Sequence, residues 1–292
     1  MRSNFQSVPL SNKGGDVPRH YHRPIRGVLI ALGISAVNAF AQTSPDPASA
    51  AAAAPVAASA ATAQPERQQQ AIDALSSMGR YLRSLNRLDV TTTSATDAVL
   101  DSGQTVSFLH ETDLKVERPN RMRADITGNR GSKGLIYDGR TFTIFNTSEG
   151  YYSKNPAPAT IDLLVRELST VYNIDTPLAD LFYWGNGKVD DATLTSALFI
   201  GLERVDTRWC NHYAYQQQGA DWELWIQSGA RQLPCRMEIV DTTQDARPRH
   251  VVTYHWTLNP EFPASTFTFR PAANAKAIEL KPATHTPYEE SE

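Results

Sequence analysis

The sequence predicts an α+β fold: one large, curved antiparallel sheet, an incomplete β-barrel, with an N-terminal helix and a helical insert that acts as a lid. Apolar residues recur at helical spacing over residues 66–85, and then at every second position through most of the remaining chain. Helical patterns interrupt the strands only once, over residues 160–184, so strands and helices do not alternate as a parallel sheet would require. A sheet of roughly a dozen strands must curl or split to bury one face.

The first half of the domain is expected to be a helix followed by consecutive strands. The helix carries one apolar stripe, formed by Ala71, Leu75, Met78, Leu82 and Leu85. The period then changes to two, which predicts strands over residues 88–100, 104–119 and 121–129, a hairpin over 133–146 and a short strand over 150–154. Asp138-Gly139 is a strong signal for the turn of that hairpin.

The helical insert divides the strands into two groups. One helix is expected over residues 160–174, with Thr160 as its N-cap, and a second over 177–184, opened by Pro177. Strands resume at 196–206 and continue through the aromatic-rich stretch 208–240, and strands over 249–260 and 265–271 close the domain.

The N-terminal residues 1–41 have the parts of a secretory signal peptide. Arg23 and Arg26 precede a short apolar run that ends in Ala39-Phe40-Ala41. Cleavage is expected after Ala41, with export to the periplasm; a buried N-terminal helix is the alternative. The apolar run is too short for a stable membrane span, so no transmembrane anchor is expected.

Residues 42–65 are almost entirely Ala, Pro, Ser and Thr, a composition that predicts a disordered linker. One domain is expected over residues 66–285, followed by a disordered tail over 286–292. Removing residues 1–41 leaves 23 basic and 30 acidic residues, a net charge near −7. No basic cluster indicates a nucleic-acid partner.

No motif indicates catalysis, a cofactor or a metal ion. The sequence has no glycine-rich phosphate loop, nucleophile elbow or paired metal-ligand spacing. The histidines of the exported chain are expected to be surface or edge residues; they are His110, His212, His250, His255 and His285. A protein that is not an enzyme is therefore expected, and a hydrolase ranks last among the functional hypotheses.

The apolar face of the sheet is the candidate ligand-binding surface. Alternation predicts that large apolar side chains of several strands point to the same side. The residues expected to line a cavity there are Met122, Ile126, Phe142, Ile144, Trp222, Leu224, Ile226, Val252, Tyr254 and Trp256. Periodicity alone does not distinguish an open cavity from an ordinary filled core.

Two cysteines, Cys210 and Cys235, are expected to form a disulfide, because export favours oxidation of a lone pair. In a three-strand meander the first and third strands lie roughly 10 Å apart, whereas a disulfide needs Cα atoms within about 7 Å. A bulge or loop near Gln232-Leu233-Pro234 would have to bring the two residues together.

Three features occur together in an order that resembles a known family: the "YDG" turn at residues 137–139, the "PLADL" segment at 177–181 and the "DWELWI…LP" hairpin at 221–234. They resemble an uncharacterised family of predicted periplasmic proteins (domain of unknown function 2092), and the match runs from about residue 70 to 282. That family is similar in architecture to the Lol lipoprotein carriers. The resemblance implies an incomplete barrel around an apolar cavity with helices as a lid, and it supplies no ligand or catalytic residues.

Two functional hypotheses follow. The first is a periplasmic protein that binds a hydrophobic ligand, such as a lipid, a lipoprotein acyl chain or an apolar small molecule. The second is a non-catalytic protein–protein module with an envelope partner, which would have a filled core and an exposed apolar patch.

Overall fold

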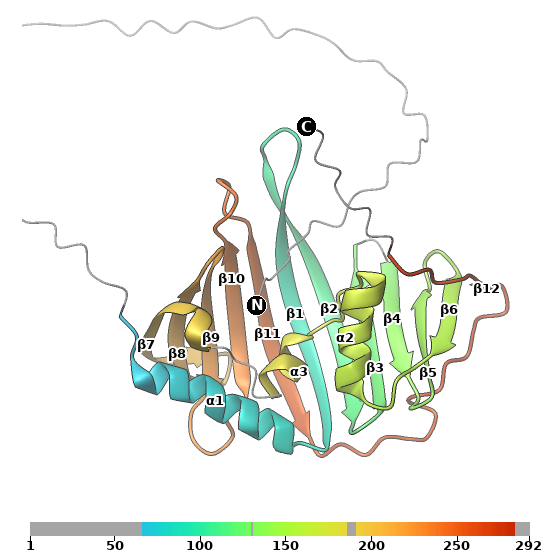
Figure 1. Ribbon diagram of the computed structural model, residues 1–292, viewed down its shortest axis with the longest axis horizontal. Helices are drawn as coiled ribbons and strands as arrows, with labels where there is room; N and C mark the ends of the chain where they lie inside the picture. Colours follow the sequence, from blue (N-terminus) through green and yellow to red (C-terminus); the bar gives the residue numbers. More distant parts are fainter. Residues whose placement is uncertain (1–65, 130, 186–190, 284–292) are drawn as a thin grey trace, which may run out of the picture. The chain divides into compact units, whose positions relative to one another are not determined.

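The computed structural model describes residues 66–129, 131–185 and 191–283. The expected signal peptide, the linker and the tail over 286–292 lie outside these described residues. Within them, twelve strands form one sheet in the order β12-β6-β5-β4-β3-β2-β1-β11-β10-β9-β8-β7 (Figure 1). The strands are β1 Arg87–Val99, β2 Thr105–Glu117, β3 Arg121–Gly128, β4 Gly131–Tyr137, β5 Thr141–Asn146, β6 Tyr151–Pro156, β7 Leu194–Val205, β8 Arg208–Gln217, β9 Ala220–Gln227, β10 Pro234–Asp241, β11 Arg249–Leu258 and β12 Lys276–Ala277.

The sheet consists of two antiparallel meanders joined through their first and last strands. Strands β1 to β6 form one meander and β7 to β11 the other, and β1 pairs with β11. The sheet stays open, because its two end strands, β12 and β7, do not pair with each other. This arrangement confirms the predicted large antiparallel sheet, and the hairpin turn at Asp138-Gly139 lies where the sequence placed it.

The helices lie on one side of the sheet (Figure 1). Helix α1, Gln69–Ser84, buries its predicted apolar stripe, and α2, Ile161–Tyr172, begins where the Thr160 side chain accepts a hydrogen bond from the Leu163 amide. The second helix of the insert, α3, Asp180–Gly185, is shorter than predicted and starts three residues after Pro177. Leu178 adopts a left-handed conformation with φ 56°, which keeps the first residues of the predicted helix in a turn.

Helices α1 and α3 approach each other at Gly79. A Cβ atom at this position would lie 2.3 Å from the Trp184 carbonyl oxygen, so only glycine fits. The two backbones therefore touch, and α3 rests directly against the middle of α1.

The predicted strand over residues 265–271 does not form. This segment runs as turns and irregular backbone along the outer side of the sheet, and only Lys276–Ala277 pair with β6. Its aromatic residue Phe269 packs against Phe145 and Tyr152 of the outer face. Nearby prolines, which lack an amide donor, favour this packing over a further ladder; they are Pro260, Pro263 and Pro271.

Candidate functional site

The ten residues predicted to share a face all point to the helix-covered side of the sheet. Residues paired directly across neighbouring strands lie on the same side, and the ladders place Val90 of β1 opposite both Trp256 and Leu114. The same registers continue outward to Met122 and Phe142 on one flank, and through Met237 to Leu224 on the other. The alternation prediction is therefore confirmed for the direction of these side chains.

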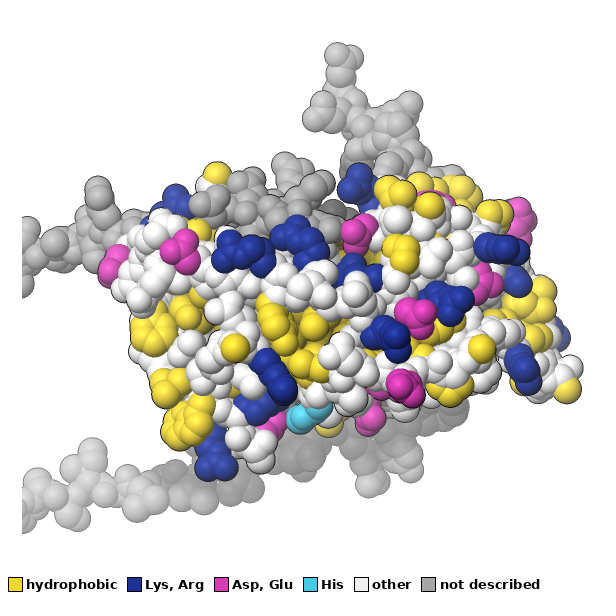
Figure 2. Space-filling model, turned by 90° about the horizontal axis from the view of Figure 1, so that it is seen from below, with side chains coloured by type: hydrophobic (Ala, Val, Ile, Leu, Met, Phe, Trp, Pro, Cys, Tyr) yellow, Lys and Arg dark blue, Asp and Glu magenta, His cyan; other side chains and the backbone are white. Residues whose placement is uncertain are grey.

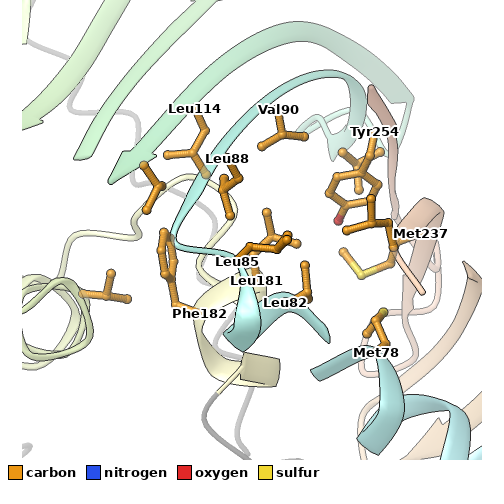
Figure 3. Packing of buried hydrophobic residues seen from close by; sticks show 14 of the residues in the cluster. Met78, Leu82, Leu85, Leu88, Val90, Leu114, Leu181, Phe182, Met237 and Tyr254 are labelled. Carbon is orange, nitrogen blue, oxygen red and sulfur yellow. The ribbon is translucent and has the colours of Figure 1, made fainter. Parts of the chain in front are cut away.

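Most of these side chains are packed into one apolar layer between sheet and helices. Six are almost completely buried: Met122, Phe142, Leu224, Ile226, Val252 and Tyr254. Ile144, Trp222 and Trp256 are partly buried and pack against the same layer. Figure 3 shows how side chains of the sheet and of α1 and α3 converge, with Leu88, Val90 and Leu114 facing Leu82, Leu181 and Phe182.

Two of the hollows in the described part of the chain differ in their walls: the larger is lined mainly by apolar atoms and the smaller mainly by polar ones. One, about 480 Å³, lies on the outer face between Thr93, Glu111, Arg236 and Thr253. The other, about 270 Å³, lies beside α1, where Asp73 and Ser77 face Asn211 and Gln227. Ile226 is the single predicted lining residue that borders either of them.

The helix-facing side of the sheet changes from apolar to polar along β1. Leu88 and Val90 belong to the apolar layer, whereas Thr92, Ser94 and Thr96 follow at the next positions of the same side. Thr96 hydrogen-bonds His250 Nδ1 at 2.8 Å. The sheet thus offers an apolar region next to a polar one.

Thr92 lies at this boundary, in a row of hydroxyl groups across three strands. It pairs with Thr112 of β2 on one side and with Tyr254 of β11 on the other, and all three residues are buried. The Tyr254 ring points from β11 toward α1 and α3 (Figure 3).

Asp180 is the first residue of α3, and its carboxylate acts electrostatically on the Tyr254 end of this row. Burial raises the pKa of the Tyr254 hydroxyl, and the charge of Asp180 adds to this effect. The surrounding protein removes part of the hydration of the Asp180 carboxyl, and Asp175 adds repulsion; together they raise the pKa of Asp180 to about 6. Asp180 is nevertheless an exposed residue. Sequence reasoning missed this group because the local pattern indicates only a helix.

The outer side of the sheet carries the disulfide. Cys210 of β8 and Cys235 of β10 are bonded across β9, with Cα atoms 6.7 Å apart, and both are fully buried. The register of β10 shifts between Pro234 and Arg236, which brings Cys235 toward Cys210. The structure thus contains the predicted bridge, and the required irregularity lies where the sequence suggested it.

His212 does not lie on the surface as predicted; it is buried next to the disulfide. Its ring stacks on Trp225 at 4.0 Å, its Nδ1 lies 3.1 Å from Glu203 Oε1, and the Trp225 indole donates to Glu203 at 2.8 Å. These hydrogen bonds lower the pKa of Glu203. Three different strands supply this network, so no local sequence pattern could indicate it.

Within the described ranges, no group of three or more His, Cys, Asp or Glu side chains is placed to hold a metal ion. In the same ranges, no helix has the length and apolar character needed to cross a bilayer. What the geometry defines is an α+β protein with one open antiparallel sheet, an apolar side under helices and a polar, disulfide-stapled outer side.

The chain belongs to the family described as predicted periplasmic protein (DUF2092), whose model matches residues 71–281. This confirms the resemblance stated from the sequence. Comparison with functionally curated proteins finds no match.

Several solved structures are similar in part. Mycobacterium tuberculosis lipoprotein LppX is 13% identical, with 67% of this chain and 98% of that chain covered and a TM-score of 0.44. LprF from Mycobacterium bovis is 11% identical (68% and 97% covered, TM-score 0.39), and a LolA superfamily protein from Nitrosomonas europaea is 14% identical (68% and 97% covered, TM-score 0.33). At these values no ligand or partner is transferred.

Proposed function

We propose that this protein is a periplasmic binding protein that takes the hydrophobic chain of a ligand into the layer between its sheet and helices α1 and α3. The observation that carries the proposal is the way α3 is held. Its side chains Leu181 and Phe182 are buried in the layer, whereas the backbone hydrogen bonds of residues 179–183 that involve described residues stay within the insert itself. Because apolar side chains make most of the contacts between α3 and the layer, the alkyl chain of a ligand can take their place when α3 moves away.

The free energies are compatible with such an exchange. Withdrawing two large side chains costs about 3–6 kcal/mol, at about 1.5–3 kcal/mol each. Burying an alkyl chain contributes about 0.8 kcal/mol per methylene. A chain of about eight methylenes therefore offsets the displacement of α3, and a longer chain gives net binding. Figure 2 shows apolar side chains in the middle of the lower face with basic side chains near them, and we infer that the ligand enters there.

Native mass spectrometry of protein purified from a bacterial periplasm tests this proposal. We expect a reproducible adduct that organic solvent removes and that Trp256→Arg, placed in the apolar layer, abolishes while the variant remains folded. Trp209→Arg is the matched control, because Trp209 is 55% exposed at the sheet edge. A bare protein mass, with no uptake of added alkyl ligands, would contradict the proposal.

The alternative, a protein–protein module, is favoured by a different observation. Four large apolar residues are exposed together on β7 and the adjoining end of β8: Phe199, Ile200, Leu202 and Trp209. Strand β7 is an edge strand, and residues 66–68 cover it only near Ala197. If this edge binds an envelope protein, Trp209→Arg should weaken that association, whereas Trp256→Arg should leave it intact.

A further inference from the structure

We infer that the hollow between α1 and strands β8 and β9 is a binding site for an oligosaccharide without acidic groups. One sugar ring would occupy the hollow, and a second would lie on Trp209. The inference goes beyond the proposed function, because a sugar needs neither an apolar chain nor a movement of α3. It assigns a ligand to a part of the molecule that the proposed function does not use.

Polar side chains of α1 form one wall of the hollow. Three of them follow each other at spacings of three and four positions, so they lie on one side of the helix; they are Gln70, Asp73 and Ser77. This side borders the hollow where α1 crosses the sheet (Figure 1). The Tyr215 hydroxyl of β8 donates to the Ala71 carbonyl at 2.9 Å and holds this part of α1 against the strand. The wall is therefore a fixed part of the fold.

The opposite wall comes from the sheet and combines polar groups with an apolar base. Asn211 and Tyr213 lie two positions apart on β8, so both point to the side covered by α1. Ile226 of β9, paired with Asn211, is buried at the base, and Gln232 borders the hollow from the segment after β9. A sugar ring has the same division, because its hydroxyl groups lie around the edge and its C–H groups on the faces.

The polar groups of the hollow are available to a ligand. The hydrogen bonds among the described residues include none to the side-chain amides of Gln70 and Gln232. Asp73 accepts one hydrogen bond, from Gln69 Nε2 at 3.0 Å, and forms no ion pair with a described residue. An amide both donates and accepts hydrogen bonds, and a carboxylate accepts several. Sugar hydroxyl groups match this set, because each of them also donates and accepts.

Other classes of ligand fit the hollow less well. Among the described residues that line it, none is Lys, Arg or His, so the carboxylate of Asp73 would repel an anion. An apolar ligand would remove water from the polar walls without replacing its hydrogen bonds. A peptide that adds a strand needs an unpaired sheet edge, whereas β8 and β9 are each paired on both sides. A sugar without acidic groups satisfies all three conditions.

Trp209 extends the site beyond the hollow. It lies two positions before Asn211 on β8 and therefore on the same side of the sheet, and 55% of it is exposed. Its carbonyl accepts a hydrogen bond from the Ser228 amide at 3.0 Å, next to Gly229, which borders the hollow. The exposed indole offers a large, rigid apolar surface to the C–H groups of a second sugar ring. An oligosaccharide should therefore bind more tightly than a monosaccharide.

Titration of the protein with glucose, maltotriose and trigalacturonate, followed by saturation-transfer NMR, tests the inference. We expect maltotriose to bind most tightly, glucose more weakly, and the acidic trigalacturonate not at all. Gln70→Ala and Asn211→Ala should each weaken maltotriose binding by about two- to twelvefold, as loss of one hydrogen bond does. Trp209→Ala should reduce the affinity for maltotriose to that for glucose and leave glucose binding unchanged.

Gln216→Ala is the matched control, because Gln216 carries its amide on the other side of β8 and does not border the hollow. A loss of maltotriose binding equal to that of Asn211→Ala would overturn the site. Equal binding of maltotriose and trigalacturonate, or failure of glucose and maltotriose to bind at millimolar concentration, would overturn the inference. None of these outcomes affects the uptake of alkyl chains, which Trp256→Arg tests separately.

Discussion

Replacing Gly79 by alanine has two opposing effects on the stability of the protein. Alanine in a helix interior is favoured over glycine by about 1 kcal/mol, so local propensity predicts a more stable protein. Packing predicts the reverse, because the new methyl group would lie 2.3 Å from the Trp184 carbonyl oxygen. Ordinary contact begins near 3.4 Å, so α3 would have to withdraw by about 1.1 Å.

We expect packing to prevail. Forcing a methyl group into a closed helix contact costs about 1–3 kcal/mol, and lifting α3 completely would expose Leu181 and Phe182 at a cost of about 3–6 kcal/mol. After the propensity gain of about 1 kcal/mol is subtracted, Gly79→Ala should lower the free energy of unfolding by up to about 2 kcal/mol. It should also increase amide exchange in residues 179–184 and, if α3 is the lid, accelerate the uptake of alkyl ligands.

Urea unfolding and hydrogen exchange measure both consequences. Ser76→Ala is the matched control, because Ser76 lies on the exposed side of α1 and its substitution reports propensity alone. A Gly79→Ala protein that is stabilised like the control, with unchanged exchange in α3, would refute the view that α3 is held against α1 at this point.

Three further predictions concern the disulfide and the titrating groups. Replacing Cys210 and Cys235 by serine should cost about 3.5 kcal/mol, the loop-closure value for a separation of 25 residues; equal urea midpoints with and without reductant would contradict this. The raised pKa of Asp180 means that its carboxylate destabilises the fold above the unfolded pKa of 3.8, most fully above about pH 6. Asp180→Asn should therefore raise the melting temperature at pH 7.5 and have no effect near pH 4, and equal shifts at both pH values would count against it. Burial and the nearby charge of His110 lower the pKa of His250 from 6.5. Protonation of His250 is therefore unfavourable in the folded state, and the stability that the neutral ring allows above pH 6.5 is lost as the pH falls. His250→Gln should lose less stability than the wild type between pH 7 and 5 in thermal melts.

The sheet was predictable from the sequence because each face is encoded by local alternation. Tyr254 and Trp256 follow one another at a period of two, so burial of one side fixes the direction of both. The same rule failed for Phe267 and Phe269, which alternate with threonine as strand residues do. Phe269 packs against Phe145 of the outer face and Phe267 packs against Phe262, so both side chains are buried or covered without pairing in a ladder. Periodicity does not distinguish this packing from a strand.

The polar parts of the candidate site were harder to predict because they depend on contacts between distant segments. The charge of Asp180 in α3 acts on Tyr254 of β11, which is 74 positions away in the chain, so only the folded arrangement brings the two into one electrostatic environment. His212, Glu203 and Trp225 come together from three strands through bulges that shift the register. Hydrophobic patterning determines which side a residue faces, and tertiary packing determines which polar group it meets there.

The two sides of the sheet also differ in how freely they can change shape. On the outer side, the disulfide joins β8 to β10, and the His212–Glu203–Trp225 contacts tie β7, β8 and β9 together. Bridged and hydrogen-bonded strands of this kind resist separation. On the inner side, α3 is held by the buried side chains of Leu181 and Phe182 and by the close approach of its Trp184 to Gly79 of α1. A ligand that enters the apolar layer would therefore displace the helix and leave the register of the strands unchanged.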